Sequence, residues 1–176
     1  LNIYQQDRDW EKAIATALEL RSDAHSFQHE VAQFYCELAQ GALYQSDYDK
    51  AREAVKQAFA ANRKCVRASI LLGDIETAQG NHDAAIAAWQ AIEKQNFEYL
   101  AMVAERLFDA YEALGKPQEG IALLRGYQRT FSQLELTDLL YQKVATYEGE
   151  ARALEAAREA VHARPSLLGV YRLVES

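Results

Sequence analysis

The stretch DYDKAREAVKQAFA, residues 47–60, places Ala51, Val55 and Ala58 at offsets of four and seven residues. These offsets put the three side chains on one face of a helix. The first of these small residues recurs along the chain at intervals of 38, 34, 35 and 33 residues. Its positions are Ala13, Ala51, Ala85, Gly120 and Ala153, with glycine standing once in place of alanine. The sequence therefore contains a repeat with a period near 34 residues.

A period of about 34 residues is typical of the tetratricopeptide repeat (TPR), a unit of two helices joined by a turn. The pattern predicts an all-α fold, a right-handed TPR superhelix (α-solenoid) of about five helix–turn–helix repeats. No stretch of useful length alternates polar and apolar residues, so we expect no strand. The expected helices span about 9–21, 28–45, 48–61, 65–79, 82–95, 98–114, 117–130, 134–147, 150–163 and 166–175.

Turn residues support this register. Gly80 and Gly115 suit the left-handed residue that ends a helix, and Pro117 suits the first turn of the next one. Pro165 closes the last full repeat. Twelve residues before each recurring small residue, the first helix carries a small residue in Ala39 and Gly73, but a large one in Phe108 and Tyr141. We therefore expect the later repeats to pack less regularly.

The repeats predict a single TPR array over residues 1–176. It comprises a partial repeat at 1–24, repeats at about 28–64, 65–97, 98–132 and 133–165, and a partial repeat at 166–176. Since both ends fall inside a repeat, we expect a fragment of a longer array, truncated at both ends. The apolar segment 167–174 is expected to cover the preceding repeat and to leave an apolar edge for a neighbouring molecule.

Composition narrows the classes of partner. The chain is 49% hydrophobic and 26% charged, with a net charge of −7. This charge argues against a nucleic-acid partner, because phosphate binding needs a basic footprint. No apolar run reaches the roughly 18 residues of a membrane-spanning helix. Two cysteines do not make a disulfide framework, and they suit a reducing compartment.

Candidate chemical sites are sparse. His25 and His29 have the spacing of a metal clamp, but Ser26 resembles a helix start and would leave His25 outside the helix. We expect Cys36 to be buried or to line a groove, and Cys65 to be a surface thiol at a helix start. No phosphate loop, nucleophile elbow or zinc-protease motif occurs. The sequence therefore predicts no enzyme, and no catalytic, cofactor-binding or metal-binding residue.

Function is expected on the concave face, because the first helices of a TPR stack line its inner groove. The predicted protein-binding residues are Gln33, Cys36, Gln40, Arg67, Asp74, Met102, Glu105, Asp109, Glu112, Glu135, Asp138 and Gln142. The later half of this set is acidic, which favours basic ligands or helix N-termini and speeds their encounter. The alternative is that these carboxylates only keep the face soluble. The Lys/Asn/Arg set that clamps chaperone tails is missing, so a chaperone-tail receptor is not expected.

Several stretches resemble the lipopolysaccharide assembly protein B family of Gram-negative bacteria. They are LNIYQ (1–5), WEKAI (10–14), VAQFYCELA (31–39), DYDKA (47–51), VRASILLG (66–73) and LGK (114–116). The resemblance follows the same order over nearly all of the chain and weakens after about Thr130. It implies an N-terminal membrane helix, a cytoplasmic TPR array and a C-terminal rubredoxin-like metal domain, with both flanking parts outside this chain. No Cys-x-x-Cys pair is present, so no metal ligand or cofactor is carried over.

The resemblance implies a non-catalytic adaptor on the cytoplasmic face of the bacterial inner membrane. Such an adaptor brings the lipid A pathway deacetylase to a membrane ATP-dependent metalloprotease, sets the lipopolysaccharide level and gathers lipopolysaccharide assembly proteins. Two alternatives stay open. One is a generic TPR scaffold of another bacterial complex. The other is an oligomerisation module, with a homo-oligomer forming through the exposed end repeats.

Overall fold

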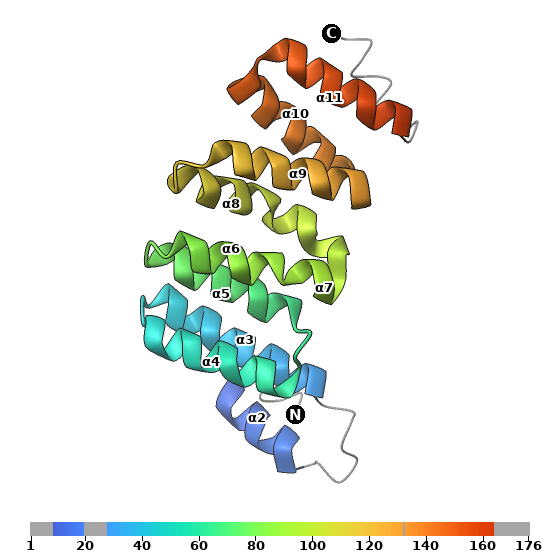
Figure 1. The fold of residues 1–176 in the computed structure, drawn as a ribbon. Helices are drawn as coiled ribbons and strands as arrows, with labels where there is room; N and C mark the ends of the chain where they lie inside the picture. Colours follow the sequence, from blue (N-terminus) through green and yellow to red (C-terminus); the bar gives the residue numbers. More distant parts are fainter. Residues whose placement is uncertain (1–8, 20–27, 132, 164–176) are drawn as a thin grey trace. The chain divides into compact units, whose positions relative to one another are not determined.

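The computed structural model describes residues 9–19, 28–131 and 133–163 (Figure 1). Within these ranges the regular structure is entirely helical, which confirms the predicted all-α TPR fold. The helices are α2 (Trp10–Glu19), α3 (Gln28–Tyr44), α4 (Tyr48–Ala61), α5 (Val66–Ala78), α6 (His82–Gln90), α7 (Ile92–Asn96), the 3₁₀ turn η2 (Phe97–Tyr99), α8 (Leu100–Ala113), α9 (Pro117–Phe131), α10 (Leu134–Glu148) and α11 (Glu150–Ala163).

The chain divides into two compact units, Leu1–Asn96 and Phe97–Ser176. In unit 1, α3 packs on α4 and α5 packs on α6. In unit 2, α8 packs on α9 and α10 packs on α11 (Figure 1). Each pair is one helix–turn–helix unit. A single continuous array over residues 1–176 stays a prediction.

The turns end the helices largely as the sequence predicts. Gly80 and Gly115 have φ of 77° and 72°, the left-handed region that glycine enters without a steric penalty. Pro117 is the first residue of α9, where its missing N–H costs no hydrogen bond. Ser46 takes the left-handed role after α3, with φ of 58°, and Asp47 then caps α4 by accepting from the Lys50 N–H at 3.3 Å. Pro165 and the segment 166–175 lie outside the described residues.

Two expected helices differ in detail. The one expected at 82–95 is divided into α6 and α7 at Ala91, although Ala91 keeps helical angles and its N–H still bonds to the Ala87 carbonyl. The one expected at 98–114 begins with the tighter 3₁₀ turn of η2 before α8. Helix termini often tighten in this way, because i→i+3 bonds satisfy terminal backbone groups.

Trp89 fills the space that Gly73 leaves in unit 1. The Trp89 side chain on α6 is 1% exposed, and its Nε1 donates to the Ile70 carbonyl of α5 at 3.2 Å. A methyl group on Gly73 would collide with the Trp89 indole ring. The indole therefore lies directly against the α5 backbone, and the fit requires that residue 73 have no side chain.

In unit 2 the large and the small residue of the pair change places between the two helices. Phe108 on α8 is 1% exposed, and a Cβ on Gly120 of α9 would lie 2.9 Å from the Phe108 Cδ2 atom. Here the first helix carries the large residue and the second helix carries the glycine. Less regular packing of the later repeats, expected from Phe108 and Tyr141, stays a prediction; at Phe108, Gly120 leaves the space that the ring occupies.

A buried carboxylate joins α4 to the turn between α5 and α6. Arg52 donates to Glu76 from Nε at 2.8 Å and from Nη2 at 3.0 Å, and Asn81 Nδ2 donates to the same carboxylate at 2.9 Å. The Glu76 side chain is 11% exposed. The Arg52 guanidinium, assisted by the Asn81 amide, holds the pKa of the Glu76 carboxyl below its ordinary value, although burial opposes this.

Gly73→Ala should lower the free energy of unfolding by about 1–3 kcal/mol, because the methyl group overpacks the Trp89 site. Gly126→Ala is the matched control, since an added methyl at this exposed position of α9 meets nothing within 4 Å. It should raise stability by up to about 1 kcal/mol through helix propensity. Urea unfolding measures both changes. Equal effects of the two substitutions would refute the close approach at Gly73.

Glu76→Gln should cost about 1–3 kcal/mol at pH 7, because it weakens two charge-assisted hydrogen bonds from Arg52. The pKa of Glu76 is lowered by folding, so its contribution is complete above the ordinary value of 4.5 and is lost as the pH falls through the lower folded-state pKa. Urea unfolding over a pH series should show the two proteins converging in acid. The exposed Glu93→Gln is the control. A difference that does not shrink in acid would contradict this assignment.

Candidate protein-binding surface

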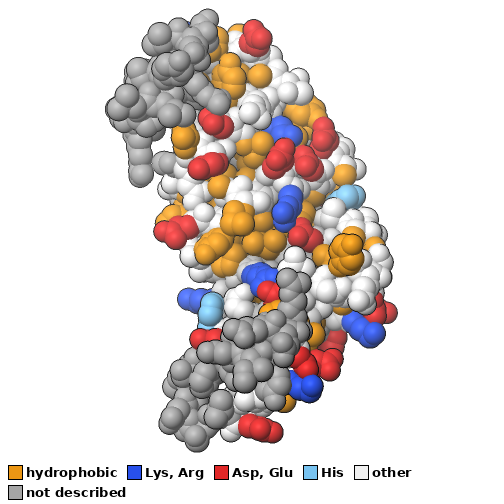
Figure 2. Space-filling view, turned by 180° about the vertical axis from the view of Figure 1, so that it is seen from behind, with side chains coloured by type: hydrophobic (Ala, Val, Ile, Leu, Met, Phe, Trp, Pro, Cys, Tyr) orange, Lys and Arg blue, Asp and Glu red, His pale blue; other side chains and the backbone are white. Residues whose placement is uncertain are grey.

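The first helices of the repeats present the surface on which the sequence places the binding residues. We call the side of α3 and α5 that carries the predicted binding residues the first-helix face of unit 1. The corresponding side of α8 and α10 is the first-helix face of unit 2. Seen from behind the view of Figure 1, the molecule shows acidic, basic and hydrophobic side chains interspersed (Figure 2). The two faces differ in how many of their charged side chains are already paired within the protein, and unpaired charges are the ones most available to a partner.

Arg67 organises the first-helix face of unit 1. Its Nη1 donates to Glu37 Oε1 at 2.7 Å, and its Nη2 donates to Gln40 Oε1 at 2.6 Å. Arg67 and Glu37 are each about one-third exposed. The cation therefore connects α5 to α3 within the protein, and a ligand would compete with these contacts. Asp74 lies half-buried farther along α5.

Of the two alternatives expected for Cys36, burial or a place in the groove, the structure shows burial, whereas Cys65 is placed differently from the prediction. Cys36 is 0% exposed, so it is not a ligand-facing groove residue. Cys65 is 2% exposed, which makes the expectation of a surface thiol wrong. Their Sγ atoms lie 3.7 Å apart, and Gln33 Nε2 also lies 3.7 Å from the Cys65 sulfur. Cysteine packs as a small apolar residue, and here α3 and the start of α5 enclose both thiols.

The α8 residues of the candidate set lie in solvent. Glu105, Asp109 and Glu112 are exposed and follow offsets of four and seven residues along one side of the helix. Met102 precedes them by three residues and is 62% exposed. The exposure is as the register requires, and the binding role of these residues stays a prediction.

Lys143 and Tyr147 on α10 modify this acidic row, and the sequence analysis did not identify either residue. Lys143 Nζ lies 3.5 Å from Asp109 Oδ1 and 4.5 Å from the centroid of the Phe108 ring. The Tyr147 hydroxyl donates to Glu112, which raises the pKa of Tyr147 because the carboxylate stabilises the protonated phenol. Asp109 and Glu112 are therefore held in part by α10. These contacts between α8 and α10 can be seen only in the structure, because the residues are far apart in the sequence.

Two carboxylates of the unit 2 face stay open. Glu105 on α8 and Glu135 on α10 are exposed, and neither forms an ion pair with another residue in the described ranges. Gln142 is also exposed, whereas Asp138 is half-buried and has an interaction partner. The unit 2 face thus keeps a local surplus of negative charge despite Lys143.

Exposed apolar side chains lie at the starts of the unit 2 elements. They are Phe97 and Tyr99 in η2, Met102 in α8 and Leu134 in α10. Gln133 holds these starts together, because its Nε2 donates to the carbonyls of Phe97 and Glu98 at 3.3 and 3.2 Å. Of these four apolar residues, the sequence analysis placed only Met102 on the binding surface. The face can therefore offer apolar area beside its carboxylates.

The predicted absence of a metal site is neither strengthened nor overturned. His29 lies exposed near the start of α3, and His25 lies outside the described residues. In the part of the chain that the structure describes, no group of three or more His, Cys, Asp or Glu side chains could hold a metal ion. Within the same part, no helix is both long enough and apolar enough to cross a bilayer.

Comparison with known proteins supports both the predicted repeat and the family resemblance seen in the sequence. The Tetratricopeptide repeat family matches residues 36–100. Lipopolysaccharide assembly protein B of Escherichia coli (strain K12) is 34% identical over 126 residues, which are 71% of this chain and 32% of that protein. The protein of the same name from Haemophilus influenzae is 26% identical over 176 residues, 99% of this chain and 44% of that protein. The chain thus spans between one-third and one-half of the length of these relatives.

Lys143→Met should lower stability by about 0.5–2 kcal/mol, because it removes the cation over the Phe108 ring. Asp109→Asn should cost less, under about 1 kcal/mol, since the Asp109 side chain is 56% exposed and water screens its ion pair. Urea unfolding of the two single variants and the double variant gives the coupling between them. An Asp109→Asn cost as large as that of Lys143→Met would contradict this assignment.

Proposed function

We propose that this chain, which belongs to the lipopolysaccharide assembly protein B family, is the protein-binding part of a non-catalytic adaptor. Three features support the proposal: the TPR fold, the relatives named for lipopolysaccharide assembly, and a first-helix face that keeps carboxylates in solvent. The last feature carries the most weight. Glu105 and Glu135 are exposed without an ion-pair partner among the described residues, so a basic partner meets them without first breaking an internal pair.

The chemistry of the unit 2 face favours a partner segment that combines cationic and apolar side chains. Carboxylates attract the cations and speed the encounter, and the exposed Met102 offers apolar area at the same surface. The unit 1 face is less suited to this role, because Arg67 is already bonded to Glu37 and Gln40. We assign first contact to unit 2.

The proposal of specific partners rests on the family resemblance. We propose that the array holds the lipid A pathway deacetylase and brings it to a membrane ATP-dependent metalloprotease, at the cytoplasmic face of the bacterial inner membrane. It also gathers lipopolysaccharide assembly proteins. A repeat array suits this task, because it offers an extended surface on which two proteins can bind close together and raise each other's effective concentration.

Capture of the purified deacetylase and the purified metalloprotease by the full 176-residue chain tests the proposal. Glu105→Lys/Glu135→Lys should weaken capture of at least one of them about tenfold or more, because the substitution replaces attraction with repulsion. The matched control, Glu93→Lys/Glu150→Lys, makes the same change in net charge on α7 and α11 and should bind as the wild type does. Capture by the wild type should also fall as salt is raised.

Two results would oppose the proposal in different ways. Equal binding by the two double variants, with helicity intact, would remove the unit 2 face from the interface. Capture of neither protein by the wild type would argue against these partners. Self-association of the wild type through its repeats would then favour the oligomerisation module.

A further inference from the structure

Cys36 and Cys65 form a buried thiol pair that bridges two consecutive repeats of unit 1. Cys36 lies within α3, and Cys65 is the N-cap residue of α5, 29 residues later. Their Sγ atoms are 3.7 Å apart. A disulfide requires a sulfur–sulfur distance of about 2.05 Å, so the two sulfur atoms must approach each other before they can bond. They are also the only two cysteines of the 176 residues.

The two thiols are chemically unequal. The two sulfurs lie within hydrogen-bond reach of each other, and the backbone N–H groups of Ala68 and Arg67 at the start of α5 favour negative charge on the Cys65 sulfur. These interactions lower the pKa of the Cys65 thiol below its ordinary value. The same hydrogen bond, together with burial, raises the pKa of Cys36. Because Cys65 is the N-cap residue of α5 and faces these backbone N–H groups, it is the more acidic thiol of the pair.

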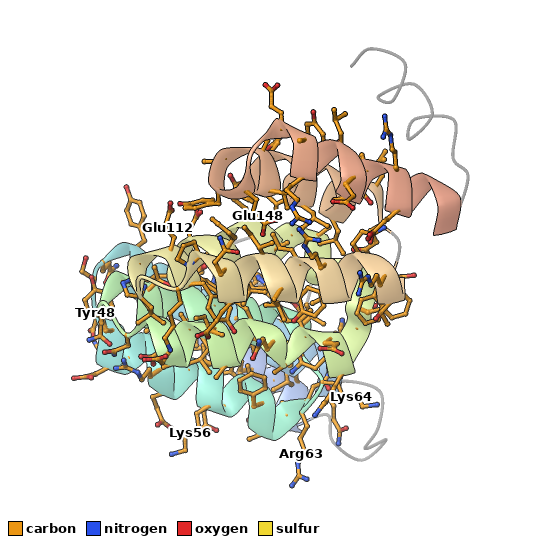
Figure 3. The ribbon with its side chains drawn as sticks, turned by 45° about the horizontal axis from the view of Figure 1, so that its top comes forward. Tyr48, Lys56, Arg63, Lys64, Glu112 and Glu148 are labelled. Atoms are coloured by element: carbon orange, nitrogen blue, oxygen red, sulfur yellow. The ribbon has the colours of Figure 1, made fainter. Side chains whose placement is uncertain are left out.

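The turn before Cys65 provides the approach to its sulfur. Arg63 and Lys64 are exposed and directly precede Cys65, and Arg63 points away from the helices (Figure 3). Since Cys65 is 2% exposed, its oxidation requires a local opening of this short turn between α4 and α5. His29 on α3 also favours negative charge on the Cys65 sulfur, the kind of setting that reactive thiolates share.

We propose that Cys36 and Cys65 are an oxidant-responsive pair that forms a reversible disulfide between α3 and α5. The Cys65 thiolate attacks one oxygen of hydrogen peroxide, the O–O bond breaks, and Cys65 becomes a sulfenic acid as hydroxide leaves. The first hydroxide takes from solvent the proton that Cys65 released on forming its thiolate, and becomes water. The Cys36 sulfur then attacks the Cys65 sulfur, the S–O bond breaks, and the departing hydroxide takes the Cys36 proton and leaves as the second water. Two thiols lose two electrons in total, and one peroxide becomes two waters.

The cross-link has a defined place on the molecule. Glu37 follows Cys36 directly, and Arg67 lies two residues after Cys65, so the disulfide forms beside the ion pair that already joins these helices. Oxidation would hold α3 and α5 together covalently where reduction leaves only non-covalent contacts. A thiol reductant reverses the bond. The cross-link does not depend on which protein the array binds.

Hydrogen peroxide treatment of the reduced 176-residue chain tests the pair. After denaturing alkylation, intact mass should show both thiols lost together, with the mass falling by two hydrogen atoms, and the cross-linked peptides should join Cys36 to Cys65. Cys36→Ala should accumulate a Cys65 sulfenic acid that dimedone labels. Cys65→Ala should oxidise about tenfold more slowly, because Cys36 stays protonated and buried.

Gln33→Ala keeps both cysteines and provides a test that does not rely on a cysteine variant folding. It should slow disulfide formation, since it removes the amide next to the Cys65 sulfur. Gln45→Ala, at an exposed position just after α3, is the matched control and should react as the wild type does. Three results would overturn the proposal: disulfides only between chains, equal rates for the two cysteine variants, or two intact thiols after a free thiol peptide in the same tube is consumed.

Discussion

The close approach of the two helices in each repeat is the constraint on which the structure depends. In α5–α6, Trp89 lies where Gly73 has no side chain, and in α8–α9 Phe108 lies over Gly120. The glycine is on the first helix in one pair and on the second in the other. In both pairs a glycine on one helix leaves room for an aromatic ring on its partner helix. Because the two helices are closely packed, a methyl group at Gly73 could be accommodated only by moving Trp89 or the helices, and this would lower the stability of the pair.

Much of the fold is readable from the sequence, because the repeat sets helix spacing locally. The bounds of α4 and α11 and the left-handed Gly80 and Gly115 follow from helical periodicity and turn chemistry. The exchange between Phe108 and Gly120 does not follow, because each residue is unusual alone and only their proximity explains both. Likewise η2 is a terminal tightening that periodicity cannot distinguish from the first turn of α8.

The sequence predicts which residues of the candidate site are exposed, but not which charged and polar side chains lie close enough to interact. The register places Glu105, Asp109 and Glu112 in solvent, but only the structure brings Lys143 beside Asp109 and Tyr147 beside Glu112. Such contacts join residues some 35 positions apart and depend on how consecutive first helices lie against each other. The same limit hid the burial of Cys65. The outcome is an uneven surface: the unit 1 face bonds largely to itself, whereas the unit 2 face keeps open carboxylates.

Hydrogen–deuterium exchange of the full chain, with and without bound lipid A pathway deacetylase, tests most directly that the first-helix face of unit 2 is the binding surface. Amide exchange should slow in α8 and α10, whose side chains form this face, and should stay unchanged in α9 and α11. Protection confined to α9 and α11, or to unit 1, would contradict the assignment and place recognition on another surface.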